Sequence, residues 1–206
     1  TFLSLPRETF RLWDDVLCPT LLGRSRFCQP GVTASPRLTN ARRGRTFGRG
    51  GSAPDGDRVD TIWTIGHSTL PLEAFLGILA QAGILALADV RRFPGSRKHP
   101  QFNQPVLAAA ARDAGIAYHA FPELGGRRTP RPGSRNTAWR VAGFQGYADY
   151  METEAFRAGA ARLMALARAH AAAIMCAEAL WWRCHRSLIA DYLKTQGFRV
   201  LHLSAG

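Results

Sequence analysis

The stretch IMCAEALWWRCHRSLIADYL, residues 174–193, places an apolar run directly before a group of chemically reactive side chains and an amphipathic helical pattern. The reactive side chains of this stretch are, in chain order, Cys176, Glu178, Cys184, His185 and Arg186. The start of a helix offers free backbone N–H groups and a positive dipole end, which suit an anion or a thiolate. We therefore expect a strand-to-helix junction at which chemistry takes place.

Short β-rich or apolar runs alternate with helical patterns along the rest of the chain. The runs cover residues 61–65, 84–90, 116–121, 171–176 and 198–203. Helical patterns begin at Pro71 and at Pro105. Two further helical patterns cover residues 147–170, with room for a break inside the pattern, and residues 187–196. Residues 124–146 have an irregular pattern. Such alternation favours a parallel sheet covered by helices. We predict an α/β fold, a single three-layer domain with a mostly parallel sheet of about five strands and helices on both faces.

Residues 1–58 differ from this pattern, because they are rich in Arg, Gly, Pro and Ser and show no sustained periodicity. The composition predicts a basic, disordered extension before an α/β domain over residues 59–206. An arm that touches nucleic acid, a solvated tail and a read-through artefact all fit this extension. The domain itself holds 17 basic and ten acidic residues, a net charge of +7.

The charge of the whole chain is +12, from 27 Lys and Arg against 15 Asp and Glu. This balance favours an anionic small molecule or nucleic acid as partner, although a genome that writes Arg for Lys explains the same counts. Four cysteines do not suggest a secreted, disulfide-stapled scaffold. Because no run approaches the ~18 apolar residues of a membrane span and no secretion signal opens the chain, we expect a cytoplasmic protein.

Polar, ionisable groups recur where the predicted strands end, and ligands of parallel α/β sheets bind at that edge. The first strand is followed by His67 and Ser68, the second ends in Asp89 and Arg91, and the third precedes a Gly-Gly-Arg-Arg loop that contains Arg127. The fourth strand leads into the stretch quoted above. Because the groups come from four separate strand ends, we expect one site there.

The cysteines of this site have alternative interpretations. Cys184, at a helix start beside His185 and Arg186, fits a nucleophile, and it equally fits a small buried hydrophobic residue. Cys176 fits a buried, inert residue better than one half of a redox couple, since the spacing is not C-x-x-C. Zinc stays open as an alternative cofactor because the two cysteines, His185 and His67 are suitable ligand types, but Cys-x7-Cys-His is not a recognised zinc spacing. We expect no cofactor.

The charged candidates also allow two interpretations. Arg186, Arg91 and Arg127 fit an anion clamp, and the alternative is that Arg side chains pair with Asp89 or Glu178. The carboxylates are at the same time candidate general acids or bases. His67 fits a base, and it equally fits a loop histidine that satisfies backbone groups. The motifs of P-loop nucleotide hydrolases, Rossmann dinucleotide-binding folds and α/β-hydrolases are absent from the sequence.

Four motifs resemble the domain of unknown function family numbered 488: TIGHS at 64–68, DVRRFPGS at 89–96, LGGRR at 124–128, and MCAE with CHR within 175–186. The resemblance extends over residues 60–202 and implies a compact single-domain α/β protein of bacteria and archaea, without an established reaction. The motif positions are His67, Ser68, Asp89, Arg91, Pro94, Ser96, Glu178, Cys184, His185 and Arg186.

We predict an uncharacterised enzyme, a hydrolase or transferase, that acts on a phosphorylated or nucleic-acid-type substrate at the strand ends. The predicted catalytic residues are Cys184, Glu178, His67 and Asp89. The predicted substrate-binding residues are Arg186, Arg91, His185, Ser68, Ser96 and Arg127. A non-catalytic nucleic-acid-binding module, and a thiol-based, rhodanese-like sulfur or redox activity, are the alternatives.

Overall fold

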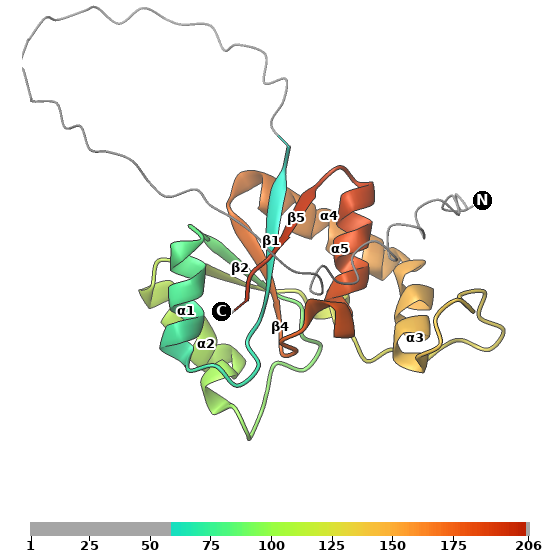
Figure 1. Cartoon of the computed structure of the whole chain (residues 1–206), viewed down its shortest axis with the longest axis horizontal. Helices are drawn as coiled ribbons and strands as arrows, with labels where there is room; N and C mark the ends of the chain where they lie inside the picture. Colours follow the sequence, from blue (N-terminus) through green and yellow to red (C-terminus); the bar gives the residue numbers. More distant parts are fainter. Residues whose placement is uncertain (1–58, 205–206) are drawn as a thin grey trace, which may run out of the picture. The chain divides into compact units, whose positions relative to one another are not determined.

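Five parallel strands form the centre of the protein in the order β3-β2-β4-β1-β5 (Figure 1). The computed structural model describes residues 59–204, so the predicted extension over residues 1–58 lies outside the described part. The strands are β1 (Thr61–Gly66), β2 (Ala86–Asp89), β3 (Ala117–Ala120), β4 (Ala172–Cys176) and β5 (Arg199–His202). The predicted α/β class and the five-stranded sheet are confirmed.

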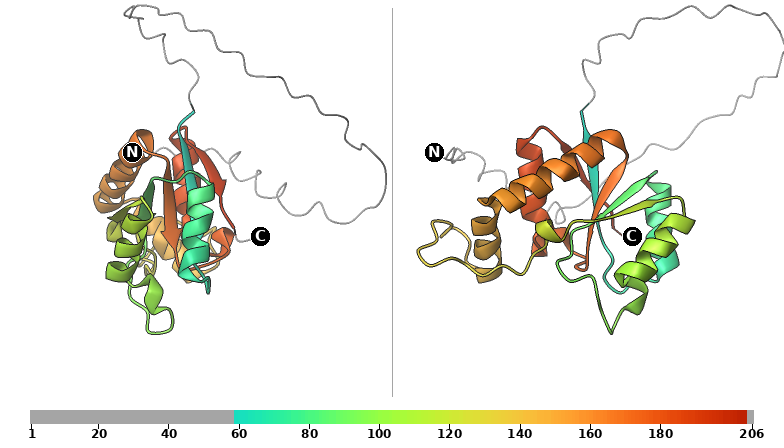
Figure 2. Two further views of the ribbon diagram at one scale, coloured as in Figure 1. Left: turned by 90° about the vertical axis from the view of Figure 1, so that its left-hand side faces the viewer. Right: turned by 180° about the vertical axis from the view of Figure 1, so that it is seen from behind.

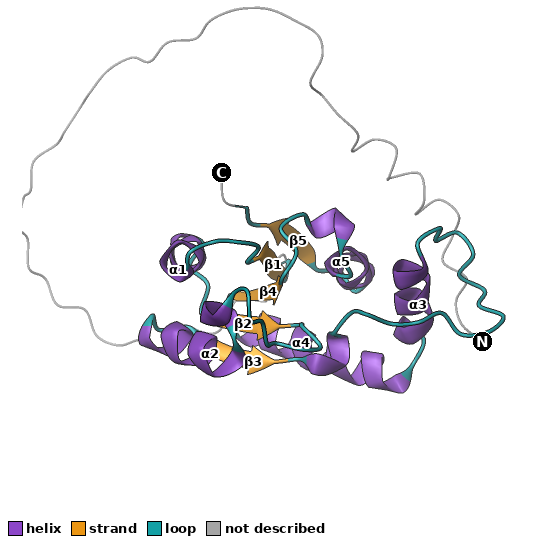
Figure 3. Ribbon diagram, turned by 90° about the horizontal axis from the view of Figure 1, so that it is seen from below, coloured by secondary structure: helices purple, strands orange, loops and turns teal. Residues whose placement is uncertain are grey.

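Helices cover both faces of this sheet. The helices are α1 (Leu72–Gln81), α2 (Gln104–Asp113), α3 (Ala142–Met151), α4 (Glu154–Ala169) and α5 (Arg186–Thr195), and the short turns are η2 (Pro100–Phe102), η3 (Pro122–Leu124) and η4 (Trp181–Arg183). Figure 3 shows α1 and α2 on one side of the strands and α4 and α5 on the other, with α3 farther out, and Figure 2 shows the same layers from two further sides. Among residues 59–204, no helix combines the length and apolar character needed to cross a membrane.

Alternation along the strands divides the core into two halves. Odd and even positions of a strand point to opposite faces of a sheet. The half beside α4 and α5 contains, among others, Ile62, Ala88, Ile174, Leu163 and Leu188. The half beside α1 and α2 contains, among others, Ile65, Leu87, Met175, Phe75 and Leu107. Strand β4 is buried along its whole length because it lies in the middle of the sheet with helices on both sides.

All five strands point the same way, so their carboxyl ends lie at one edge, onto which Figure 3 looks. Helix α5 begins there, directly after Cys184 and His185. The strand-to-helix junction predicted from residues 174–193 is therefore formed by β4, η4 and α5. This edge is where the fold brings together the loops that carry the predicted site residues.

One helix boundary differs from the prediction. The irregular segment is predicted to run over residues 124–146, but α3 already begins at Ala142. Its first turns contain Gly143 and Gly146, which read as loop residues in the sequence. A side chain at Gly146 would lie 2.5 Å from the Arg128 carbonyl oxygen, so tertiary contact rather than local propensity places a glycine in this helix.

The interruption expected within residues 147–170 is present, since α3 ends at Met151 and α4 begins at Glu154. Thr153 caps α4: its hydroxyl oxygen accepts a hydrogen bond from the backbone N–H of Phe156 at 3.3 Å. The hydroxyl also donates to the carbonyl oxygen of Tyr150 at 2.7 Å. The capping residue thus joins the end of one helix to the start of the next.

Thr153→Ala removes both hydrogen bonds, so we expect it to lower the free energy of unfolding by about 1 kcal/mol. Thr153→Ser keeps the hydroxyl group and should stay close to the parent protein. Urea unfolding followed by circular dichroism measures both variants. Equal losses for Ala and Ser would show that the capping hydroxyl is not the cause.

Candidate functional site

The sulfur atoms of Cys176 and Cys184 lie 3.4 Å apart at the carboxyl end of the sheet. Cys176 is the last residue of β4, and Cys184 lies between η4 and α5. Both side chains belong to the core half beside α4 and α5, with 2% and 7% of their surface exposed. The sequence favours a buried, inert Cys176; the structure shows it buried, with its sulfur directly against that of Cys184.

Arg186, the first residue of α5, is almost completely buried, with 1% of its surface exposed. Its backbone N–H and its Nε lie 3.4 Å and 3.3 Å from the sulfur of Cys184. Its Nη2 donates to the backbone carbonyl oxygens of Glu178 and Ala179, and its Nη1 lies 3.5 Å from Oγ1 of Thr64. Among residues 59–204, no carboxylate forms an ion pair with this guanidinium. The Cys184 sulfur is therefore the hydrogen-bond partner that can carry the compensating charge.

The surroundings of the two sulfurs favour opposite protonation states. The pKa of Cys184 is lowered to about 6, because the Cys176 thiol donates a hydrogen bond to it and because Arg186 supplies positive charge and two N–H donors, against the effect of burial. The pKa of Cys176 is raised well above its usual value by that same hydrogen bond and by burial. Near neutral pH the pair consists of a Cys184 thiolate and a Cys176 thiol.

A second buried polar cluster is centred on Asp89, the last residue of β2. Its carboxylate accepts hydrogen bonds from Nε of Arg91 at 2.9 Å and from Nη2 of Arg91 at 2.6 Å. The Tyr118 hydroxyl donates to the same carboxylate at 2.7 Å, and Nη2 of Arg91 also donates to the carbonyl oxygen of Phe102 at 2.8 Å. The Asp89–Arg91 pair that the sequence leaves open is thus formed, and it is buried and bidentate.

His67 belongs to this second cluster. Its ring stacks on Phe102 with 4.1 Å between centroids, and its Nδ1 lies 3.0 Å from the carbonyl oxygen of Ser68. Because a carbonyl only accepts, Nδ1 carries the proton, and the lone pair of Nε2 faces Nη1 of Arg91 at 3.5 Å. Burial lowers the pKa of His67 to about 4, and the charge of Arg91 adds to that effect. The imidazole is therefore neutral at pH 7.

The two clusters lie on opposite faces of the sheet. Asp89 alternates with Ala88, which packs beside α4 and α5, so its side chain points toward α1 and α2. Cys176 points to the other face. Backbone hydrogen bonds join the two sides, since the N–H of His67 donates to the carbonyl oxygen of Cys176 at 3.0 Å. The strand ends converge as the sequence predicts, but their side chains form two clusters.

Gly66, between the clusters, leaves the space that Arg186 needs. A Cβ atom at this position would lie 1.8 Å from the carbonyl oxygen of Glu178 and 2.8 Å from Nη2 of Arg186. The turn continues through Ser68, which has a positive φ of 47° and whose N–H donates to the carbonyl oxygen of Ala177 at 2.9 Å. The absence of a side chain at Gly66 thus lets β1 end beside the loop after β4.

Three further predicted residues lie in loops around this edge. Glu178 is exposed, and it contacts Arg186 through its backbone carbonyl rather than its carboxylate. Ser96 holds the loop after β2: its N–H donates to Oδ1 of Asn103 at 2.6 Å, and its hydroxyl accepts from the N–H of His99 at 3.1 Å. Arg127 is exposed and has a positive φ of 57°. The functional roles predicted for Arg127 and for the other site residues stay predictions.

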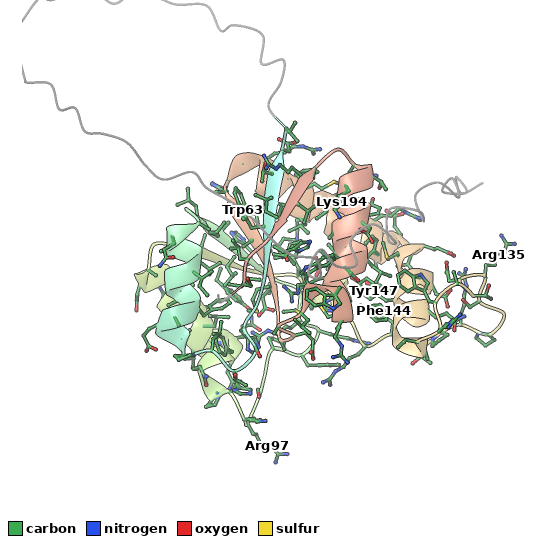
Figure 4. The ribbon with its side chains drawn as sticks, viewed as in Figure 1. Trp63, Arg97, Arg135, Phe144, Tyr147 and Lys194 are labelled. Atoms are coloured by element: carbon green, nitrogen blue, oxygen red, sulfur yellow. The ribbon has the colours of Figure 1, made fainter. Side chains whose placement is uncertain are left out.

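His185, directly after Cys184, connects the start of α5 to the loop after β2. Its Nε2 lies 3.1 Å from the carbonyl oxygen of Val90, so Nε2 carries the proton and Nδ1 the lone pair. Nδ1 faces Gly126, where a Cβ atom would come within 2.9 Å of it. Burial lowers the pKa of His185 to about 4, and the charges of Arg186 and Arg128 act in the same direction. Figure 4 shows Tyr147 beside the start of α5, which is the lower end of that helix in the view. The ring of Tyr147 lies 5.3 Å from that of His185.

Sequence reasoning does not identify Thr64 as a partner of Arg186, or His202 as the residue that holds Thr64. Thr64 is completely buried, and its Oγ1 lies 2.8 Å from Nδ1 of His202. The ring of Trp181 stacks on His202 at 3.9 Å with an interplanar angle of 2°. A threonine inside an otherwise apolar strand is the signal that indicates such a partner, because a buried hydroxyl needs a hydrogen bond.

No metal site is formed by the part of the chain that the structure describes, where no three His, Cys, Asp or Glu side chains are grouped to hold an ion. Of the four zinc candidates, His67 lies on the face opposite the cysteines, and Nε2 of His185 is bound to a backbone carbonyl. A cavity of about 490 Å³ lies elsewhere, at the edge of the sheet between β3 and α4. It is lined by Tyr118, His119, Ala120, Phe121, Arg162 and Leu166.

One comparison with known proteins gives a match. The model of the family described as "Domain of unknown function DUF488" matches residues 71–193, more than half of the chain. The matched range contains Asp89, Arg91, Cys176, Cys184 and Arg186, whereas β1 and the turn after it lie before this range and His202 lies after it. No curated protein and no solved structure matches the chain.

Gly66→Ala should strongly destabilise the protein, because the added methyl group meets a backbone carbonyl that cannot rotate away. We expect a loss of about 3 kcal/mol in the free energy of unfolding. Gly77→Ala is the matched control, since nothing lies within 4 Å of a Cβ there and Gly77 lies inside α1. That variant should gain about 0.5–1 kcal/mol. Similar stabilities of the two variants in urea unfolding would contradict the close approach.

Proposed function

The chain belongs to the family described as domain of unknown function DUF488, and since that description assigns no reaction, we propose a function from the Cys184 site. The protein is a cysteine-dependent hydrolase or transferase in which the Cys184 thiolate attacks an anionic, phosphorylated or nucleic-acid-type substrate. One observation carries this proposal. A buried guanidinium without a carboxylate partner among residues 59–204 directs its Nε, together with the adjacent backbone N–H, at the Cys184 sulfur.

The protonation state supports Cys184 as the nucleophile. A thiolate attacks electrophiles and a thiol does not, so a pKa near 6 makes most of Cys184 reactive at pH 7. Cys176 has the opposite tendency, because its pKa is raised. Cys184 is also the more exposed of the two, at 7% against 2%. The substrate therefore meets Cys184 first.

In this proposal the two buried arginines position other groups and do not bind the substrate directly. The donors of Arg186 are directed at the cysteine, at Thr64 and at backbone carbonyls. Those of Arg91 are directed mainly at Asp89 and a carbonyl. Both side chains are buried, at 1% and 9% exposure. Their positive charges still favour an anion nearby.

The first contacts with an anionic substrate come from exposed basic residues in the loops at the same edge. Arg92, Arg127 and Arg183 are exposed, and none of them forms an ion pair within residues 59–204. An Arg side chain that is not already paired can bind phosphate or carboxylate with two parallel hydrogen bonds. The positive charge of the domain has the sign that this requires.

Two groups in the segment that carries the thiolate are suited to proton transfer. His185 is neutral at pH 7 and presents the lone pair of Nδ1, since its Nε2 is held by Val90. Glu178 carries an exposed carboxylate on the loop between the two cysteines. His67 and Asp89 lie on the opposite face of the sheet, so in this proposal they stabilise the turn after β1 and do not move protons at Cys184.

A non-catalytic nucleic-acid-binding module is the second candidate, and exposed basic loops favour it. Arg97 and Arg135 project from the body of the protein in Figure 4, and both are exposed. Lys98 and Arg140 are also exposed on the same two loops. This function requires binding to RNA or DNA that weakens steeply with salt and that survives Cys184→Ser. Turnover that Cys184→Ser abolishes would favour the enzyme, whereas binding without turnover, unchanged in Cys184→Ser, would favour the binding module.

Alkylation of Cys184 by iodoacetamide should depend on pH with a midpoint near 6, the value to which its pKa is lowered. The rate should fall as the pH drops below 6 and reach a plateau above about pH 7, whereas a free thiol with a pKa near ~8.5 keeps gaining reactivity to higher pH. The full chain with Cys18→Ser and Cys28→Ser is used, so that only Cys176 and Cys184 remain. Mass spectrometry of the tryptic peptide 184–186 measures the reaction.

Arg186→Met should move that midpoint upward by one pH unit or more, because it removes the charge and the Nε donor beside the sulfur. Arg183→Ala is the matched control, since Arg183 is exposed and makes no ion pair within residues 59–204. Its midpoint should stay near 6. Because each change removes a trypsin site, Cys184 is followed in peptide 184–194 of the Arg186→Met variant and in peptide 169–186 of the Arg183→Ala variant, where fragmentation identifies the alkylated cysteine. A parent profile that matches a free thiol would contradict the proposed nucleophile.

A further inference from the structure

We propose that Cys176 and Cys184 form a reversible disulfide after a hydroperoxide oxidises Cys184, with Cys176 as the resolving thiol. The inference rests on the proposed function in one respect, the thiolate of Cys184, and adds a second reaction of the same sulfur. The observation that supports the disulfide is the 3.4 Å contact between the two sulfur atoms.

The contact requires little movement to become a bond. A disulfide has an S–S distance of about 2.05 Å, so the sulfurs must approach by about 1.4 Å. The intervening residues 177–183 form an exposed loop and the short turn η4, apart from Trp181, which is half-buried. Cys176 is held at the end of β4, so the movement comes from the loop side, where Cys184 lies between η4 and α5.

The two cysteines differ in the way that this reaction requires. Cys184 carries the charge and keeps 7% of its surface exposed, which admits a small oxidant such as hydrogen peroxide. Cys176 is a thiol with 2% exposure, so an external oxidant does not reach it first. Its sulfur lies 3.4 Å from that of Cys184 and 3.9 Å from the carbonyl oxygen of Glu178, and its role is to attack Cys184 after that residue has been oxidised.

The chemistry balances with the hydroperoxide as the only oxidant. The Cys184 thiolate attacks one peroxide oxygen, the O–O bond breaks, and a sulfenic acid forms while the leaving hydroxide takes up a proton to become water. The sulfur of Cys176 then attacks the sulfur of Cys184, the S–O bond breaks, and hydroxide leaves with the Cys176 proton as a second water. Two thiols have lost two electrons to one peroxide, and an added thiol reverses the disulfide.

Disulfide formation also changes the surroundings of Arg186. A disulfide sulfur carries no charge, so the buried guanidinium loses the one group that compensates it among residues 59–204. An uncompensated buried charge is strongly unfavourable. The carbonyls of Glu178 and Ala179, which accept from Arg186, lie in the exposed loop. Oxidation should therefore loosen residues 177–186.

The test uses the full chain with Cys18→Ser and Cys28→Ser, treated with about one equivalent of hydrogen peroxide, alkylated and digested with trypsin. Cleavage after Arg168, Arg183 and Arg186 separates the two cysteines into peptides 169–183 and 184–186. We expect the two peptides joined by a disulfide as the main oxidised product, and dithiothreitol should release them. Hydrogen exchange of residues 177–186 should become faster in the oxidised protein.

Variants assign the two roles. Cys176→Ser and Cys176→Ala should accumulate a Cys184 sulfenic acid that dimedone traps, whereas the parent protein should show at least fivefold less trapping. Cys184→Ser should leave Cys176 reduced at the same dose of peroxide. The disulfide itself is detected in the protein that keeps both Cys176 and Cys184, so the test decides the proposal even when a variant folds poorly.

The failure of this inference can be told apart from that of the proposed function. A low midpoint of alkylation, together with Cys184 sulfenic or sulfinic acid and no joined peptides, overturns the disulfide and keeps the nucleophile. An alkylation profile like that of a free thiol overturns the thiolate and, with it, both proposals.

Discussion

The buried guanidinium of Arg186 is the constraint on which the carboxyl edge of the sheet depends. A charge removed from water is tolerated only where hydrogen bonds and an opposite charge surround it. Here β1 contributes Thr64 and the space above Gly66, and the loop after β4 contributes backbone carbonyls. The negative partner is the sulfur of Cys184. The shape of the turn, the choice of glycine and the ionisation of the thiol therefore follow from one side chain.

The other buried arginine at this edge is compensated in a different way. Arg91 pairs with the carboxylate of Asp89, which accepts hydrogen bonds from Nε and Nη2 of the guanidinium and another from the Tyr118 hydroxyl. A carboxylate in that position is a stable partner with low reactivity. The thiolate beside Arg186 is a strong nucleophile. The same physical requirement, met by two different anions, makes one cluster a support and the other a candidate site.

The sequence predicts the fold well because its signals are local. Apolar runs that end in polar residues and helices that end near Gly83, Gly115 and Gly197, all with positive φ, mark the elements without knowledge of their packing. The common edge follows from the parallel arrangement. The division of the site into two clusters does not, because it depends on which face each side chain takes. The close pair of sulfurs is equally hidden, since the loop of residues 177–183 folds back only in three dimensions.

The contact between the two sulfurs links the reactivity of Cys184 to its own inactivation. The Cys176 thiol stabilises the thiolate because it donates a hydrogen bond, and a donor must lie within contact distance. A hydroxyl or amide donor would stabilise the thiolate without any further reaction. A thiol donor instead brings a second sulfur to the position from which it can attack an oxidised Cys184. A thiolate that is activated by a neighbouring thiol is therefore open both to oxidation by peroxide and to disulfide formation. Because Cys176 is buried, this oxidation begins at Cys184.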